Sequence, residues 1–184
     1  MVAGATTFAL ELFRPSLNFD VLVGRTTRFC NTAINYSFLD ALDRVGFIGL
    51  PFEYQDFVRR YDLKRVEHVP VANALELVQK MLASRVYVGN QSVNFALADG
   101  LKITRALEAF EPAPVACPVG GVCMEYNKTA TLGQFLGSVL NQQLAVGNDL
   151  DGDYFDSILP QEGYKPPFKE RVRLAFRGKK KRKF

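Results

Sequence analysis

Short runs of apolar residues alternate along this chain with segments in which apolar side chains recur at helical spacing, and this alternation constrains the fold most strongly. Continuously apolar runs of this length are typical of strands that are buried on both faces of a parallel sheet. The expected strands are Phe19–Gly24, Val45–Leu50, Arg65–Val69, Arg85–Val88 and Ile103–Leu107, and the expected helices are Tyr36–Arg44, Phe52–Arg60, Ala74–Ala83 and a helix between Val88 and Ile103. Strands that alternate with helices of about ten residues predict an α/β fold, a Rossmann-like parallel sheet with helices on both faces.

Polar residues follow two of the expected strands. Arg25, Thr26 and Arg28 belong to the sequence RTTR after the first strand, and Asn90, Gln91 and Ser92 belong to GNQS after the fourth strand. Ligands of open parallel sheets bind at the carboxyl ends of strands, where helix N-termini favour anions, so we expect a phosphate site there, with Gly89 permitting close backbone approach. Capping of the following helix by Asn90 or Ser92 is the structural alternative. Neither a G-x-G-x-x-G motif nor a P-loop occurs in the sequence.

The length and composition fit one globular domain. The chain has 184 residues, of which 48% are hydrophobic. We expect an N-terminal extension at residues 1–18, the Rossmann-like domain at 19–147, and an extended arm with a basic tail at 148–184. No apolar run approaches the ~20 residues that span a bilayer, so we expect no transmembrane segment and a cytoplasmic location. Three cysteines and a single distant histidine favour neither a disulfide framework nor a metal site.

The carboxyl-terminal third begins with a segment rich in proline and glycine. We expect a loop from Pro112 onward and then a last helix from Thr131 to Leu144, whose apolar stripe faces the core or a partner. The arm that follows carries aromatic residues and is typical of segments that wrap around a neighbouring subunit. We therefore expect other protein subunits, identical or different, as partners.

Positive charge is concentrated at the end of the chain. Residues 165–184 contain ten Lys or Arg against one acid, which gives +9, and since the whole chain carries +4, residues 1–164 carry 4 − 9 = −5. The run at the extreme end consists of Lys179, Lys180, Lys181, Arg182 and Lys183. Such a run is either a solubilising tail or a weak, nonspecific contact with an anionic partner, because clustered Lys and Arg bind phosphates without reading sequence.

An ordered set of short sequences resembles a known enzyme family. RTTRF, GLPFE, VGNQS and FALADGLK follow one another between Phe19 and Glu108, about half of the chain. This order is similar to the carboxyl-terminal half of bacterial glycosyltransferases of the GT-B type, close to the ADP-heptose:lipopolysaccharide heptosyltransferase family. The resemblance implies a Rossmann-like domain that holds a sugar nucleotide, so a sugar-nucleotide donor is the ligand we expect, and no other cofactor.

The resemblance also implies roles for single residues. Arg25, Thr26 and Arg28 would contact the donor diphosphate, which Asn90, Gln91 and Ser92 would hold from the other side, while Glu108 would accept hydrogen bonds from ribose hydroxyls. Glu53 is a weaker candidate, because glutamate in a first helical turn commonly complements the helix dipole. No catalytic residue is assigned.

Two departures from the family pattern open a second hypothesis. The helix after Ser92 lacks the histidine that the family usually has there, and only about 18 residues precede the first expected strand, too few for the acceptor-binding domain. Either a second domain or subunit completes the enzyme, or the chain is a non-catalytic structural or interaction protein of a larger assembly on a degenerate transferase fold. A phage-encoded virion component is one example, in which case the location would be the host cytoplasm or the virion.

Overall fold

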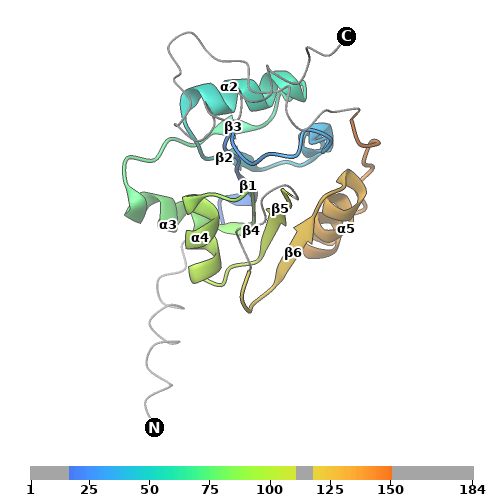
Figure 1. The fold of residues 1–184 in the computed structure, drawn as a ribbon. Helices are drawn as coiled ribbons and strands as arrows, with labels where there is room; N and C mark the ends of the chain where they lie inside the picture. The colour runs from blue at the N-terminus through green and yellow to red at the C-terminus, as the bar shows by residue number, and fades with distance from the viewer. Residues whose placement is uncertain (1–16, 111–117, 151–184) are drawn as a thin grey trace, which may run out of the picture. The chain divides into compact units, whose positions relative to one another are not determined.

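A six-stranded parallel sheet forms the centre of the protein. We describe a computed structural model, in which residues 17–110 and 118–150 are placed. The strand order is β3-β2-β1-β4-β5-β6, and every neighbouring pair is parallel. The strands are β1 Phe19–Gly24, β2 Val45–Phe47, β3 Glu67–His68, β4 Ser84–Gly89, β5 Arg105–Glu108 and β6 Cys123–Tyr126. The prediction of an α/β, Rossmann-like parallel sheet is therefore confirmed (Figure 1).

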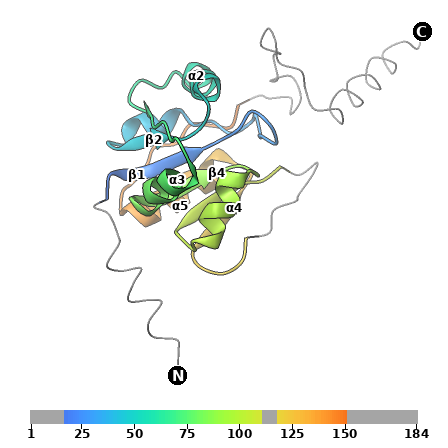
Figure 2. The same ribbon diagram turned by 90° about the vertical axis from the view of Figure 1, so that its left-hand side faces the viewer.

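The helices cover both faces of this sheet. They are the 3-10 helix η1 Ser37–Ala41 and the α-helices α2 Pro51–Arg60, α3 Ala74–Leu82, α4 Val93–Gly100 and α5 Thr129–Leu140. Figures 1 and 2 show α3 and α4 together on one side of the sheet, and Figure 1 shows α5 on the other side. From β1 through β2 to β3 the chain proceeds toward one edge of the sheet. It then crosses to β4 and proceeds through β5 toward the opposite edge. Right-handed crossovers therefore place their helices on opposite faces.

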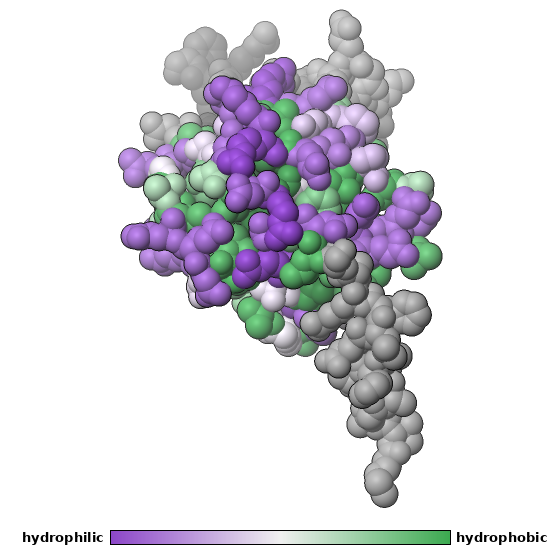
Figure 3. Space-filling model, turned by 180° about the vertical axis from the view of Figure 1, so that it is seen from behind, coloured by the Kyte–Doolittle hydropathy of each residue, from purple (hydrophilic) through white to green (hydrophobic). Residues whose placement is uncertain are grey.

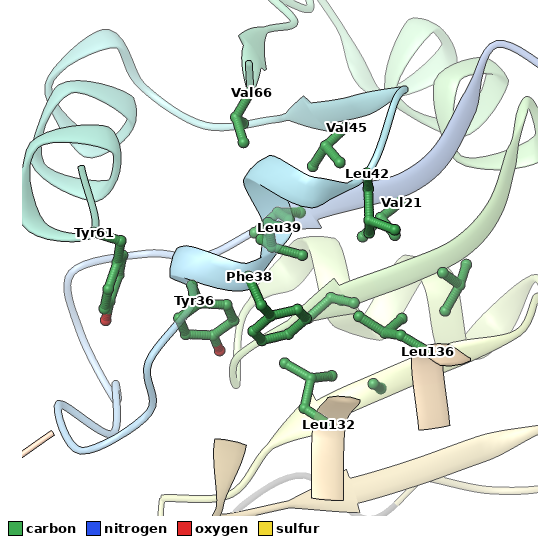
Figure 4. Packing of buried hydrophobic residues seen from close by; sticks show 14 of the residues in the cluster. Val21, Tyr36, Phe38, Leu39, Leu42, Val45, Tyr61, Val66, Leu132 and Leu136 are labelled. Atoms are coloured by element: carbon green, nitrogen blue, oxygen red, sulfur yellow. The ribbon is translucent and has the colours of Figure 1, made fainter. Parts of the chain in front are cut away.

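Successive side chains of the central strands belong alternately to two separate hydrophobic cores. Val21 and Val23 of β1 pack with η1, α2 and α5, whereas Leu22 between them packs with α3 and α4. Strand β4 repeats the division, since Val86 and Val88 belong to the first core and Tyr87 to the second. This is the two-residue period of a strand that is buried on both faces. Figure 4 shows part of the first core, where side chains of η1 lie between the strands and α5.

Several element boundaries differ from the expectations. The segment Tyr36–Arg44 forms only the short 3-10 helix η1, because Leu42 is already extended, with ψ 150°, and leads the chain into β2. The expected loop after Pro112 contains a strand, β6, in which Tyr126 is buried and Glu125 exposed. Helix α5 ends earlier than expected, since Asn141 adopts the left-handed conformation that terminates helices.

All of the described residues belong to one compact unit. Residues 1–16, 111–117 and 151–184 lie outside the described residues, and with them most of the expected arm and the basic tail. Among the helices of the described part, none combines the length and apolarity that crossing a membrane requires. Hydrophilic and hydrophobic side chains are intermixed on the back of this part (Figure 3).

Candidate functional site

The carboxyl ends of β1 and β4 meet at the point where the chain reverses its direction of travel along the sheet. The two strands pair in parallel with Gly24 opposite Gly89, so the segments that follow them begin side by side. The connection after β1 leads to η1 on one face, and the connection after β4 leads to α4 on the opposite face. Such a switch point is where ligands of open α/β sheets bind. The sheet thus brings the two predicted polar segments to one edge.

The two glycines at this point make room for a tyrosine. The Tyr87 hydroxyl donates to the Gly24 carbonyl at 3.2 Å, and a Cβ atom on Gly24 would lie 2.0 Å from that hydroxyl oxygen. A Cβ atom on Gly89 would lie 2.8 Å from the Gly24 carbonyl oxygen. Gly89 thus permits the close approach of the β1 backbone and of Tyr87, which occupy the space where a Cβ atom would lie. Burial raises the pKa of Tyr87 strongly, so its hydroxyl keeps its proton.

Asn90 fastens the segment after β1 to the end of β4. Its side chain is fully buried, and its Nδ2 group donates to the carbonyls of Thr26 at 2.9 Å, Arg28 at 2.7 Å and Phe29 at 3.4 Å. Its Oδ1 atom accepts from the Thr26 N–H at 3.1 Å. Asn90 does not cap α4, since that role belongs to Ser92, whose hydroxyl accepts from the Phe95 N–H at 3.3 Å.

Arg25 and Glu108 form a buried ion pair next to this segment. Nε of Arg25 donates to Oε2 of Glu108 at 2.7 Å, and Nη2 donates to Oε1 at 3.3 Å. Their side chains are 5% and 0% exposed. Burial alone would lower the pKa of Arg25, but the Glu108 carboxylate raises it well above the usual value, so the Arg25 guanidinium stays charged.

Tyrosine side chains surround the ion pair. The Tyr36 hydroxyl donates to Oε2 of Glu108 at 2.7 Å and lies 2.5 Å from the Tyr126 hydroxyl. The Tyr36 and Tyr61 rings lie 5.4 Å and 5.9 Å from the Arg25 guanidinium carbon, in cation–π contact. Burial, together with the Glu108 carboxylate, raises the pKa values of Tyr36 and Tyr126. The buried Tyr61 hydroxyl has no hydrogen-bond partner among the described residues.

Glu108 also holds the end of the segment that starts at Arg25. Its Oε1 atom accepts a very short hydrogen bond from the Asn31 N–H, and Nη2 of Arg25 donates to the Asn31 carbonyl at 3.3 Å. The segment from Arg25 to Asn31 is thus attached to the sheet twice, through Asn90 and through Glu108. We name it the β1 loop. Its shape is set by buried side chains of β4–α4 and β5.

The remaining predicted site residues lie in different surroundings. Arg28 is exposed, Thr26 is half-buried, and Gln91 is buried at 8% exposure beside the start of α4. Glu53 caps α2, because its Oε2 atom accepts from the Leu50 N–H at 2.9 Å. The tail residues Lys179 to Lys183 lie outside the described residues.

Sequence reasoning missed three members of the buried network, Asn31, Tyr36 and Tyr126. Each reaches Glu108 or its partner across a long sequence separation, and no motif marks any of them. Searched across residues 17–110 and 118–150, the structure brings no three His, Cys, Asp or Glu side chains together as metal ligands.

Comparisons with protein-family models, with curated proteins and with solved structures find no match for this chain.

Proposed function

We propose that the switch point between β1 and β4 binds the diphosphate group of a sugar nucleotide, as the donor-binding half of a GT-B glycosyltransferase does. The observation that carries the proposal is the parallel pairing of β1 with β4, which sets the β1 loop beside the start of α4. Anions are favoured at such a place, because the first N–H groups of a helix have no partner within the helix and its dipole is positive there. Glycosyl transfer itself would require a second domain or subunit that brings the acceptor.

Some of the predicted residues would contact the phosphate, and others stabilise the β1 loop. Arg28 is exposed and is the cation of the β1 loop that can reach a phosphate. Arg25 and Glu108 neutralise each other below the loop. We therefore assign Glu108 to support and not to a ribose contact, because its carboxylate already accepts from Arg25, Tyr36 and Asn31.

Calorimetric titration of the full chain with ADP, UDP, GDP and CDP tests this function. We expect micromolar binding of at least one of the four, weakened about tenfold by Arg28→Ala through loss of a charge-assisted contact. Arg59→Ala is the control, since Arg59 is an exposed arginine of α2 that lies outside the β1 loop and pairs with Asp56. Absence of binding by all four nucleotides would refute the proposal.

A second candidate is a non-catalytic component of a larger assembly. Leu50 and Val93, at the starts of α2 and α4, are 56% and 76% exposed at the same carboxyl edge of the sheet. Exposed apolar side chains can take part in a protein contact. Sedimentation of the full chain, with and without a Leu50→Glu and Val93→Glu double substitution, tests this candidate. Self-association that the substitution abolishes would support it, and a monomer in both cases would count against self-assembly.

A further inference from the structure

The β1 loop presents its carbonyl groups inward. Three of them, from Thr26, Arg28 and Phe29, point to the single Nδ2 group of Asn90. One buried amide therefore fixes the orientation of several peptide planes in the loop.

The orientation of these carbonyls determines where the neighbouring N–H groups point. In a planar trans peptide the C=O of one residue is antiparallel to the N–H of the next, and no described peptide bond is cis. With the Thr26 and Arg28 carbonyls directed at Asn90, the N–H groups of Thr27 and Phe29 are directed away from it. Neither N–H donates a hydrogen bond to any residue in the described part of the chain.

The loop also holds a backbone conformation that brings N–H groups together. Phe29 has φ 53°, a left-handed conformation that is uncommon for a residue with a large side chain. Its ring packs edge-on against Phe110 at 5.6 Å, and its carbonyl is held by Asn90, so the surrounding structure maintains the conformation. A left-handed residue within a turn directs successive N–H groups into one concave surface that attracts anions.

We propose that the N–H groups of Thr27 and Phe29, together with the Arg28 guanidinium, bind one phosphate group, and that Asn90 is the residue that positions them. The carboxylate that contacts the loop, Glu108, is neutralised by Arg25 and so does not repel the anion. This inference deepens the proposed function, on which it rests, because it names the groups that contact the phosphate. Asn90 acts through the loop and does not contact the ligand.

Titration of the ¹⁵N-labelled full chain with pyrophosphate, followed by NMR, tests the inference directly. We expect the amide signals of Thr27 and Phe29 to show the largest saturable shifts, with those of α2 and α5 unchanged. Saturable shifts confined to other amides would overturn the inference, as would the absence of any saturable shift.

Substitution of the positioning residue gives the second test. Asn90→Leu keeps the side-chain size but removes every hydrogen bond to the loop, so we expect at least an approximately tenfold loss of pyrophosphate affinity. Gln134→Leu, on the exposed side of α5, is the matched control and should bind as the unsubstituted chain does. Unchanged affinity in a folded Asn90→Leu protein would overturn the assignment of Asn90. If that protein does not fold, the titration of the unsubstituted chain still decides the inference.

Different results would overturn the proposed nucleotide binding and the proposed phosphate site. Pyrophosphate binding at Thr27 and Phe29, without binding of any of the four nucleoside diphosphates, would support the phosphate site and reject the proposed function. Binding of a nucleoside diphosphate that leaves both amides unshifted would support the proposed function and overturn the phosphate site.

Discussion

The guanidinium of Arg25 and the carboxylate of Glu108 form a buried two-point ion pair, with Nε to Oε2 at 2.7 Å and Nη2 to Oε1 at 3.3 Å. The pair joins the end of β1 to the end of β5 across the strand between them, β4. Because the same carboxylate holds the Asn31 N–H, the pair also fixes the far end of the β1 loop. The charges of Arg25 and Glu108 thus stabilise the β1 loop.

Glu108→Gln is expected to destabilise the fold strongly. The substitution leaves the Arg25 charge buried without its partner, and removal of one member of a buried pair costs about 3–5 kcal/mol. Urea denaturation measures the change in the free energy of unfolding. Asp43→Asn, which breaks the exposed pair of Asp43 with Arg65, is the control and should leave the urea midpoint unchanged. Equal effects of the two substitutions would contradict the structural role of Glu108.

Gly24→Ala is expected to destabilise the protein by ~1–3 kcal/mol, because the new methyl group would overlap the Tyr87 hydroxyl. Adding Tyr87→Phe removes that hydroxyl and should recover part of the loss, since the ring carbon that bears it would still lie 2.8 Å from the Cβ atom of the new alanine. Thermal unfolding of the single and double variants measures both effects. Gly100→Ala, at a helical glycine with nothing within 4 Å of an added Cβ, should be neutral or slightly stabilising. A double variant no more stable than Gly24→Ala would mean that the Tyr87 hydroxyl is not the obstacle.

Alkaline pH is expected to destabilise the fold through its buried tyrosines. Burial is the main cause that raises the pKa of Tyr61 from 10.0 to about 12, while the Arg25 charge lowers it in part and the Glu108 carboxylate raises it further. The folded protein therefore holds this proton more tightly than the unfolded chain. The resulting stabilisation is fully present below pH 10.0 and is lost as the pH rises through about 12. Tyr36 and Tyr126 act in the same direction.

Urea denaturation at a series of pH values, combined with the ultraviolet absorbance of tyrosinate, measures this dependence. We expect the free energy of unfolding to fall on the alkaline side, with much of the tyrosinate signal appearing together with unfolding. Full tyrosine ionisation in a protein that stays folded would contradict the buried network.

Tyr61→Phe and Tyr36→Phe are expected to have different effects. The Tyr61 hydroxyl is buried without a hydrogen-bond partner in the described structure, so its removal should be neutral or stabilising. The Tyr36 hydroxyl bonds to Glu108 and lies next to the Tyr126 hydroxyl, so its removal should cost about 1–3 kcal/mol. Chemical denaturation of the two variants side by side measures the difference. A larger loss for Tyr61→Phe than for Tyr36→Phe would show that the hydrogen bonds are wrongly assigned.

The sequence was sufficient to predict the sheet and the edge at which polar residues gather. Continuous apolar runs such as FDVLVG and VGFIGL mark strands buried on both faces, and the residues after parallel strands must meet at one edge. The edge strand β6 escaped prediction because its four residues, CMEY, follow a Pro- and Gly-rich segment and carry only one fully buried side chain.

The direction in which the polar side chains point could not be predicted. Arg25 and Glu108 are 83 residues apart in sequence, and whether each faces a ligand or the other depends on the pairing of β1, β4 and β5. The hydrogen-bond partners of Asn90 were equally unpredictable, since a side-chain amide after a strand can cap a helix or bind a neighbouring loop. Local pattern locates such residues, and only the tertiary fold assigns their partners.

A crystal structure of the full chain, soaked to saturation with the nucleoside diphosphate that binds most tightly, would locate the phosphate site. We expect the phosphates at the carboxyl ends of β1 and β4, within hydrogen-bond distance of the β1 loop and beside Arg28. A nucleotide bound elsewhere on the molecule, or an empty switch point at saturating concentration, would contradict this expectation.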